Sequence, residues 1–428
     1  MGALGLGVME TQTVVKTPHD TFSEWATVIG VGIFATGLSQ PDLLQLPFRV
    51  LLTHETLSSS EHNTQTMALF FLIGMLPWSL KVIPGLLLDS VPLFGTRRRY
   101  YLIVGALGAS LLWLLLAVVP RTFATLAAVC FCMNVFLVIA SSAGGALYVE
   151  AGDRLAITDR LTSVRLWVDN FNSLVAGAFA GLLARVSFTA FAVSVAVIPL
   201  TMVPVAWRLV KEPQAAKYQH STLQNAWTSI KIVVRTRDVW IAFAFLCFIC
   251  ALQSFLSPQY KLQTEVLNFK VVTIGILQSI SGLGGILGAF LYGALRRKWN
   301  LRTWLLLGVA CACMDPFLYL FYTSLYAAIP IDFMHGLLDV MTALAMFELA
   351  ARATPANTAA LGFAFIASAW NAGIPLGDNI AALLSDTYKL SFHEVMTVFS
   401  CVAVLAFPAV LLLPQSMVAD LPVTGQTT

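Results

Sequence analysis

The chain consists largely of apolar stretches that are each long enough to cross a lipid bilayer. A transmembrane helix needs about 20 consecutive, mainly apolar residues. Only 11% of the residues are charged, whereas soluble domains average about a quarter. The pattern therefore predicts an integral membrane protein with twelve transmembrane segments, at residues 22–52, 65–88, 99–119, 122–150, 160–184, 187–210, 238–261, 271–295, 301–323, 325–350, 356–385 and 392–414.

These segments are expected to be helices. Backbone groups in lipid need hydrogen-bond partners within the protein, and only helices and closed barrels provide them. The stretches lack the alternating pattern of about ten residues that is typical of membrane barrel strands. The predicted fold class is therefore all-α, with twelve transmembrane helices. The first twenty residues lack the basic-then-apolar order of a cleaved signal, so the first helix is expected to remain in the mature protein.

The distribution of lysine and arginine predicts how the segments are oriented. Eighteen of the 25 basic residues fall in the termini and even-numbered loops, six fall in the odd-numbered loops, and Lys81 lies within a helix. Because cytoplasmic loops are enriched in basic residues, both termini are expected on the cytoplasmic side of a cell membrane (inner or plasma). This arrangement accounts for the net charge of +3, so no nucleic-acid partner is expected.

One polar segment divides the spans into two sets of six. The predicted units are a cytoplasmic tail (1–21), a six-helix bundle (22–210), a cytoplasmic linker (211–237), a second six-helix bundle (238–414) and a cytoplasmic tail (415–428). A weak repeat relates residues 85–102 to 288–305, since both run from a glycine-bearing helix end through arginines into a new span. Paired six-helix halves are typical of secondary transporters of the major facilitator type, whose site lies at the midplane between the halves.

One stretch, LKVIPGLLLDSVPLFGTRRRYYL at residues 80–102, resembles the folate/biopterin transporter family of the major facilitator superfamily. The matching positions are Lys81, Gly85, Asp89, Ser90, Pro92, Leu93, Gly95, Arg97 and Arg98. The stretches TEVLNFKVVTIGILQSISGLGGILGAFLYGALRRKWNLR and TPANTAALGFAFIASAWNAG are also similar to that family. The resemblance implies transport of folate or another pterin-like anion. A muropeptide-permease-like relative shares the general Lys, Asp and Gly-Arg-Arg arrangement, so it is an alternative.

Ionisable and strongly polar side chains within the spans are costly in lipid, so each is a functional candidate. Pro41 interrupts the first span, which predicts either a break that presents Gln40 and Asp42 to a cavity or a simple helix end. Arg165 and Asp169 have the spacing of a helical ion pair, which fits a structural pair as well as a substrate site. The predicted substrate-binding residues are Gln40, Asp42, Lys81, Arg165, Asp169, Asn172 and Asn371.

Two basic residues of the first half differ in their expected depth. Lys81 lies about 10 Å along the helix from the end of its span, so it is deep enough to meet substrate. Arg49 lies towards the outer end of the first span and is expected to be a surface anchor rather than a ligand; the alternative is that it attracts an anionic solute together with Lys81 and Arg165.

A histidine and several carboxylates in the second half predict proton coupling. His335 and Asp339 share one face of the tenth span, and a carboxylate beside a histidine in a low dielectric can exchange protons near neutral pH. Asp378 is predicted to be a further proton carrier. Asp332 is expected at the outer end in contact with solvent. Asp315, which precedes a proline, is a third candidate proton carrier but is expected mainly to cap a helix break.

The charged hinge after the second span predicts a latch on the cytoplasmic side. Asp89 lies close in sequence to Arg97 and Arg98, and Glu150 lies at the end of the fourth span. We expect these four residues to gate the cytoplasmic side through contacts that break as the halves move. The alternative is that the arginines only fix the orientation of the protein.

Other motifs narrow the class of protein. The chain has no GxxxxGK[ST] motif, which argues against an ATP-driven pump. The seven cysteines lie in apolar spans and fit apolar filling, and glycines 282, 284, 285 and 288 fit close helix packing. We expect no catalytic residue, cofactor or metal.

The predicted function is secondary active transport of a small organic anion, coupled to protons, by a monomer that alternates its access across the lipid bilayer. Another solute importer or exporter of the same superfamily is an alternative. A non-transporting membrane receptor or assembly factor on the same fold is the alternative from a different class.

Overall fold

The computed structural model describes residues 21–53, 63–212, 220–295, 301–354, 359–411 and 413–414. In these ranges the chain is all-α and has no named strand, as predicted. The α-helices are α1 (Phe22–Leu38), α2 (Gln45–Leu51), α3 (Asn63–Ser79), α4 (Val82–Ser90), α5 (Arg99–Leu116), α6 (Phe123–Leu155), α7 (Thr158–Leu183), α8 (Phe188–Leu200), α9 (Met202–Leu209), α10 (His220–Arg235), α11 (Arg237–Leu252), α12 (Leu256–Lys261), α13 (Val271–Leu295), α14 (Leu301–Leu318), α15 (Leu325–Ala353), α16 (Ala359–Asp386), α17 (Phe392–Val404) and α18 (Ala406–Leu411). A π-helical segment (Leu262–Val266) follows α12, and a 3₁₀ turn (Tyr319–Phe321) follows α14.

Ten helical segments in the described ranges are long and apolar enough to cross a membrane. They correspond to ten of the twelve predicted spans. The first span is formed by α1 and α2, and the eleventh is the 28-residue α16. Helices α6 and α15 continue beyond the predicted ends, to Leu155 and Ala353. Hydropathy identifies only the apolar part of a helix, so it misses these polar last turns.

Four helices that begin at the same end of the bundle have serine or threonine caps. Thr122, Ser187, Ser324 and Ser391 precede α6, α8, α15 and α17, and each side-chain oxygen accepts a backbone N–H of the first turn. Such caps satisfy N–H groups that the start of a helix leaves without partners. We call this end of the molecule the capped end. The opposite end, where residues 210–237 connect the two sets of helices, is the linker end.

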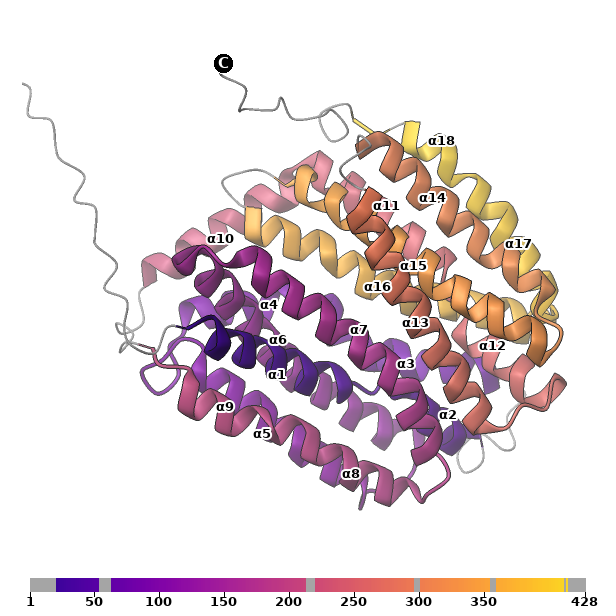
Figure 1. Cartoon of the computed structure of the whole chain (residues 1–428), viewed down its shortest axis with the longest axis horizontal. Coiled ribbons are helices and arrows are strands. Elements are labelled where there is room, and N and C mark those ends of the chain that lie inside the picture. Colours follow the sequence, from indigo (N-terminus) through magenta and orange to yellow (C-terminus); the bar gives the residue numbers. More distant parts are fainter. Residues whose placement is uncertain are drawn as a thin grey trace, which may run out of the picture.

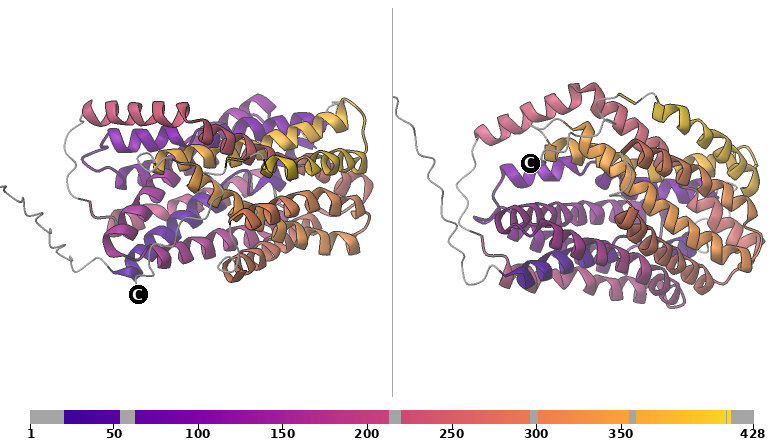
Figure 2. Two further views of the ribbon diagram at one scale, coloured as in Figure 1. Left: turned by 90° about the horizontal axis from the view of Figure 1, so that it is seen from above. Right: turned by 45° about the horizontal axis from the view of Figure 1, so that its top comes forward.

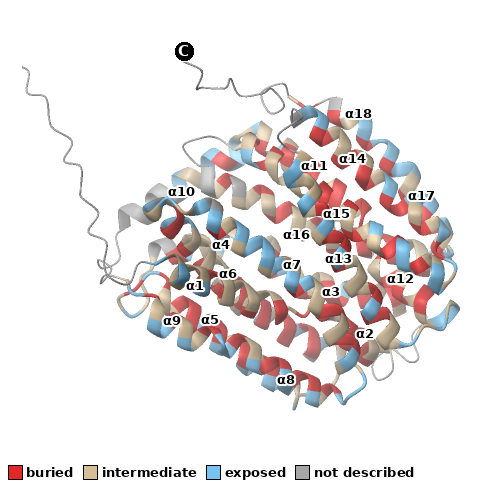
Figure 3. Ribbon diagram, viewed as in Figure 1, coloured by how far each residue is buried: buried red, intermediate tan, exposed pale blue. Residues whose placement is uncertain are grey.

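The helices form two groups that lie side by side (Figure 1). Helices α1 to α9 form the first half, α11 to α18 form the second half, and the two views of Figure 2 show the same division. Each half has its own core: the rings of Phe48, Trp113 and Phe191 meet in the first, and those of Phe255 and Tyr319 in the second. Figure 3 shows exposed residues mainly along the outer helix faces.

Two helix pairs form most of the contact between the halves, α7 with α13 and α3 with α16. A Cβ atom on Gly177 of α7 would lie 2.5 Å from the carbonyl oxygen of Gly275 of α13, so these backbones touch. One turn further, Ser279 Oγ accepts a hydrogen bond from the backbone N–H of Ala178 at 2.8 Å. Small residues allow this close approach. The halves therefore meet tightly towards the capped end.

The predicted packing role of the α13 glycines is confirmed. A Cβ atom on Gly282 would lie 2.9 Å from the backbone of Leu174 in the first half. Cβ atoms on Gly284 and Gly288 would press on backbone atoms of α15. Helix α13 therefore packs between α7 of the first half and α15 of the second.

Candidate functional site

A break in the first span positions two of the predicted residues. Helix α1 ends at Leu38 and α2 begins at Gln45, with a turn between them. Pro41 lies in this turn and lacks the N–H that would continue the helix. Gln40 lines a cavity within the first half, and Asp42 lines a cavity between the halves. Of the two alternatives for this segment, the break is the one observed.

The first-half cavity has a volume of roughly 190 Å³ and is bounded by residues of α1, α6, α7 and the α3–α4 junction. Lys81 lies at this junction and lines the cavity. Its Nζ donates a hydrogen bond to Ser141 Oγ at 3.0 Å and lies 5.2 Å from the centroid of the Trp78 ring. An aromatic face attracts a cation at this distance. Lys81 is therefore held at the cavity wall.

Arg165 and Asp169 form the ion pair that their spacing predicted. The distance between Arg165 Nε and Asp169 Oδ2 is 3.6 Å, and both side chains are about half exposed on the wall of the first-half cavity. Exposed ion pairs contribute about 0–1 kcal/mol to stability. The pair can therefore exchange partners with a ligand at small cost.

The two predicted asparagines hold helices together. Asn172 is buried, and its Nδ2 donates to the carbonyl oxygen of Ile33 at 3.1 Å, which fixes α7 against α1. Asn371 Nδ2 donates to the carbonyl oxygen of Trp78 at 3.2 Å, across the two halves. Neither side chain is among the residues that line the two cavities.

The inter-half cavity has a volume of roughly 230 Å³ and is lined by both halves. Its acidic, basic and histidine side chains are Asp42, Arg49, Asp332, His335 and Asp339. Glutamines and tyrosines supply further hydrogen-bonding groups, at Gln45, Gln259, Tyr260, Gln263, Gln278 and Tyr319. The cavity thus combines charged groups with neutral donors and acceptors, as a site for a polar organic molecule requires.

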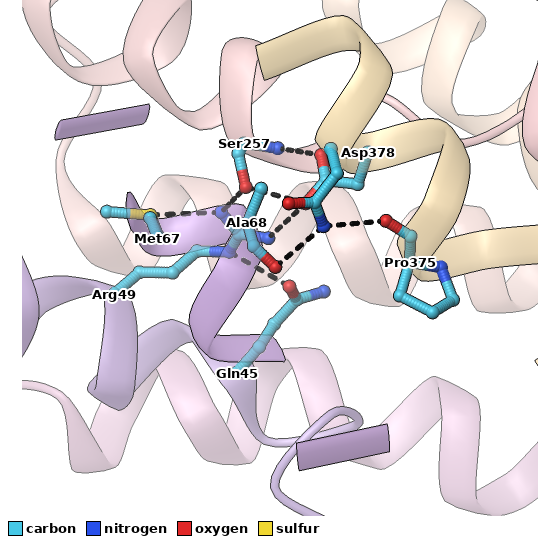
Figure 4. A network of polar contacts seen from close by, with 8 residues as sticks. Gln45, Arg49, Met67, Ala68, Ser257, Pro375 and Asp378 are labelled. Carbon is cyan, nitrogen blue, oxygen red and sulfur yellow. Dashed lines mark hydrogen bonds and ion pairs between the residues drawn. The ribbon is translucent and has the colours of Figure 1, made fainter. Parts of the chain in front are cut away.

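Arg49 lies at the capped end of this cavity, in the network drawn in Figure 4. Its side chain is 2% exposed, so the expectation of a surface anchor was wrong. Helix α2 turns it into the protein, where its Cζ lies 4.8 Å from the Phe71 ring and 5.7 Å from the Tyr260 ring. Its Nη1 donates to Ser257 Oγ at 3.0 Å, and its Nη2 lies 3.9 Å from Asp378 Oδ2. The network joins the halves.

Two carboxylates of α16 take part in this closure. Asp378 accepts hydrogen bonds from the backbone N–H and the Oγ of Ser257, both at 2.6 Å. Asp386 accepts the backbone N–H of Gln65 at 2.8 Å and lies 3.4 Å from Lys261 Nζ. Gln65 belongs to the first half, so Asp386 also links the halves. Sequence analysis did not identify Asp386 as a functional residue.

His335 forms its ion pair with Asp315. The expectation that its partner is Asp339 was wrong. His335 Nδ1 lies 2.8 Å and 3.0 Å from the two carboxylate oxygens of Asp315, whose side chain is fully buried. Asp339, one turn along α15 from His335, lines the inter-half cavity. Helix α14 packs against α15, and this contact brings Asp315 to the histidine. A carboxylate in the middle of an apolar span was the sequence signal for this pair.

Asp332 is a second buried acceptor near the histidine. It is 3% exposed, so the expectation of a solvated outer residue was wrong. The hydroxyls of Tyr319 and Tyr322 each donate to one of its oxygens at 2.8 Å. The two tyrosines come directly after α14, Tyr319 in the 3₁₀ turn and Tyr322 at its end.

Two of the predicted gating residues form an ion pair at the linker end. Arg98 Nη2 and Nε lie 3.0 Å and 3.2 Å from Glu150 Oε1. The backbone N–H groups of Arg98 and Arg99 donate to Glu212 Oε2 at 3.0 Å and 3.1 Å. These contacts connect α5, α6 and the segment after α9, which all belong to the first half.

The remaining gating residues lie around a tight turn. Leu93 and Thr96 exchange backbone hydrogen bonds at 2.8 Å and 3.0 Å, and Gly95 has a φ of +80°, which favours glycine. Arg97 is exposed beside this turn. The side chain of Asp89 lies outside the described residues.

Comparison with known proteins supports the same fold and family. A family model described as the BT1 family matches residues 57–427. A folate-biopterin transporter of Synechocystis sp. is 29% identical over 227 residues, which are 51% of this chain and 45% of that protein. The chain spans about half the length of the curated relatives it matches.

Two solved structures have the same fold at low identity. The nucleoside transporter NupG has a TM-score of 0.68 at 12% identity, over 93% of this chain and 99% of NupG. A POT family transporter in complex with 5-aminolevulinic acid has a TM-score of 0.70 at 10% identity, over 94% of this chain and 98% of that one. The predicted major facilitator fold and the family resemblance are both confirmed. The chain therefore belongs to the BT1 family of membrane-spanning proteins.

Proposed function

We propose that the protein is a secondary transporter that moves a small organic anion across the membrane by alternating access. The observation that carries the proposal is the inter-half cavity, which is lined by charged groups of both halves and closed at the capped end by side-chain contacts. Such contacts can break and reform while each core stays packed. Movement of one half against the other then exposes the cavity at either end.

The proposed substrate is folate or another pterin-like anion. The folate-biopterin transporter of Synechocystis supports this class. Lys81 and Arg165 in the first-half cavity supply positive charge for an anion, and the Trp78 ring beside Lys81 offers a flat apolar surface. Gln40 and Asp169 complete the polar wall. The half-exposed Arg165–Asp169 pair supports a path towards the linker end.

Proton coupling is part of the proposal. The partly buried His335 and the fully buried Asp315 form a pair of groups that can each hold a proton, and Asp339 lies at the adjoining cavity wall. Asp378 at the capped end is the further proposed proton carrier. We also propose two six-helix units over residues 22–210 and 238–414, with the linker end and both termini in the cytoplasm.

Lys81→Ala is expected to lower the initial rate of folate uptake into proteoliposomes by about tenfold or more, because a charged hydrogen bond contributes about 1.5–3 kcal/mol. Lys81→Arg keeps the charge and is expected to retain most of the rate. Lys270→Ala, which removes an exposed lysine before α13, is the matched control. Unchanged uptake by folded Lys81→Ala protein would remove this lysine from the substrate site.

Counterflow separates transport from the receptor alternative. Proteoliposomes loaded with unlabelled folate are expected to accumulate labelled folate without any ion gradient. A receptor would bind folate and show no exchange. Accumulation that ignores an imposed pH gradient would contradict proton coupling while leaving transport itself intact.

A further inference from the structure

Arg49 is a buried cation at the wall of the inter-half cavity. Its side chain is 2% exposed, and the short helix α2 that carries it begins just after the break at Pro41. Because the guanidinium stays charged in proteins, a buried arginine requires partners of opposite charge or several hydrogen bonds. The contacts that Arg49 already makes therefore show how much of its hydrogen-bonding capacity is left for a ligand.

Those partners are mostly neutral. Nε donates to Gln45 Oε1 at 2.9 Å, and Nη1 donates to Ser257 Oγ at 3.0 Å and contacts Met67 Sδ at 3.1 Å. The only carboxylate paired with Arg49 among the described residues is Asp378, and its Oδ2 lies 3.9 Å from Nη2. That distance exceeds a hydrogen bond. Among the described residues, the Nη2 group therefore pairs with a carboxylate only at long range.

Asp378 is satisfied without the arginine. Its two oxygens accept the backbone N–H and the hydroxyl of Ser257 at 2.6 Å each, so its hydrogen bonds lie within the second half. Figure 4 shows Arg49 reaching this pair from the first half, with Ser257 between the two charges. Arg49 thus contacts the second half through one hydrogen bond to Ser257, one long ion pair with Asp378 and the ring of Tyr260.

We propose that Arg49 binds a carboxylate group of the substrate and that Asp378 competes with this carboxylate for the guanidinium. A planar guanidinium binds a carboxylate through two parallel hydrogen bonds, which are shorter and stronger than the present contact to Asp378. When Arg49 turns to a ligand in the cavity it leaves Ser257, and the capped end loses a bond between the halves. Substrate binding therefore loosens the closure on this side. The inference rests on the proposed transport function.

The test measures ligand binding by purified full-length protein, with folate as the probe that carries carboxylates and biopterin as the probe that lacks them. Arg49→Gln is expected to weaken folate binding by about tenfold or more and to leave biopterin binding within about twofold. Asp378→Asn removes the competitor and is expected to tighten folate binding. Glu265→Gln, which removes an exposed carboxylate of the second half outside this network, is the control and is expected to leave folate binding unchanged.

A purely structural role gives a different result. If Arg49 only held the helices together, Arg49→Gln and Asp378→Asn would weaken both ligands and lower thermal stability together, and the proposal would be overturned. Folate binding that is equal in Arg49→Gln and the unmodified protein would also overturn it. If the unmodified protein bound biopterin but not folate, the proposed role of Arg49 would be overturned. The proposed transport function would not be contradicted by that result. Failure to bind either ligand, with no counterflow, would contradict the proposed function itself.

Discussion

A Gly336→Val variant is expected to unfold at a temperature about 5 °C or more below that of the unmodified protein and to be recovered in low yield. A Cβ atom at Gly336 would overlap the carbonyl oxygen of Ser281, and one at Gly284 would overlap that of Phe333. The backbones of α13 and α15 thus touch along this line, so no flexible side chain can move aside. Overpacking costs about 1–3 kcal/mol, and rigid backbone contacts place this site at the upper end.

Gly293→Val is the matched control, because it adds the same side chain to α13 at a position where a Cβ atom meets nothing within 4 Å. Its melting temperature is expected to stay within about 2 °C of the unmodified value. Thermal unfolding in detergent, followed by circular dichroism, measures both variants. Equal melting temperatures for Gly336→Val and Gly293→Val would show that α13 and α15 are further apart than described.

Asp315→Ala is expected to abolish uptake driven by a pH gradient while folate counterflow continues. The change removes the only described ion-pair partner of His335 and leaves the partly buried imidazole without that acceptor. Within the described residues, the imidazole then has no paired carboxylate with which to exchange a proton. Counterflow needs no net proton movement, so it reports on substrate binding and on the movement of the halves alone.

The control for this experiment is Glu348→Gln, which breaks another ion pair of α15. Glu348 Oε1 lies 3.1 Å from Arg352 Nη2, one turn along the same helix. This variant is expected to keep both gradient-driven uptake and counterflow. If Asp315→Ala lost both activities together with thermal stability, the histidine pair would be structural and proton coupling would lie elsewhere.

The spans and their division into two groups could be read from the sequence. Lipid requires about 20 apolar residues in each helix, and this requirement leaves a strong pattern in the chain. The Arg165–Asp169 pair could also be predicted, because helical periodicity alone brings the two side chains together. The missing N–H of Pro41 predicted an interruption of the first helix, but it did not decide between a break and a simple helix end. Each of these features depends on residues close together in the chain.

The partners of His335 and Arg49 depend on contacts between distant segments. Asp315 lies 20 residues before His335 on a different helix. Helical spacing within α15 could predict a partner only on the same helix, which was Asp339. Arg49 contacts Ser257, which is 208 residues away. Its position near the end of an apolar stretch favoured a surface site, whereas side chains of α3 and α12 surround it in the folded protein. Helical periodicity contains no information on which helices become neighbours.

A cross-link between the halves tests alternating access most directly. Ala178→Cys and Ser279→Cys, introduced after replacement of the seven native cysteines, place two thiols where α7 meets α13 near the capped end. Ala117→Cys and Thr189→Cys provide the control, since Thr189 Oγ1 donates to the carbonyl oxygen of Ala117 at 3.3 Å within the first half. Oxidation of the cross-half pair is expected to stop folate counterflow, and reduction is expected to restore it, while the control pair exchanges folate in both states. Full counterflow through protein whose halves are covalently joined at this point would contradict the account.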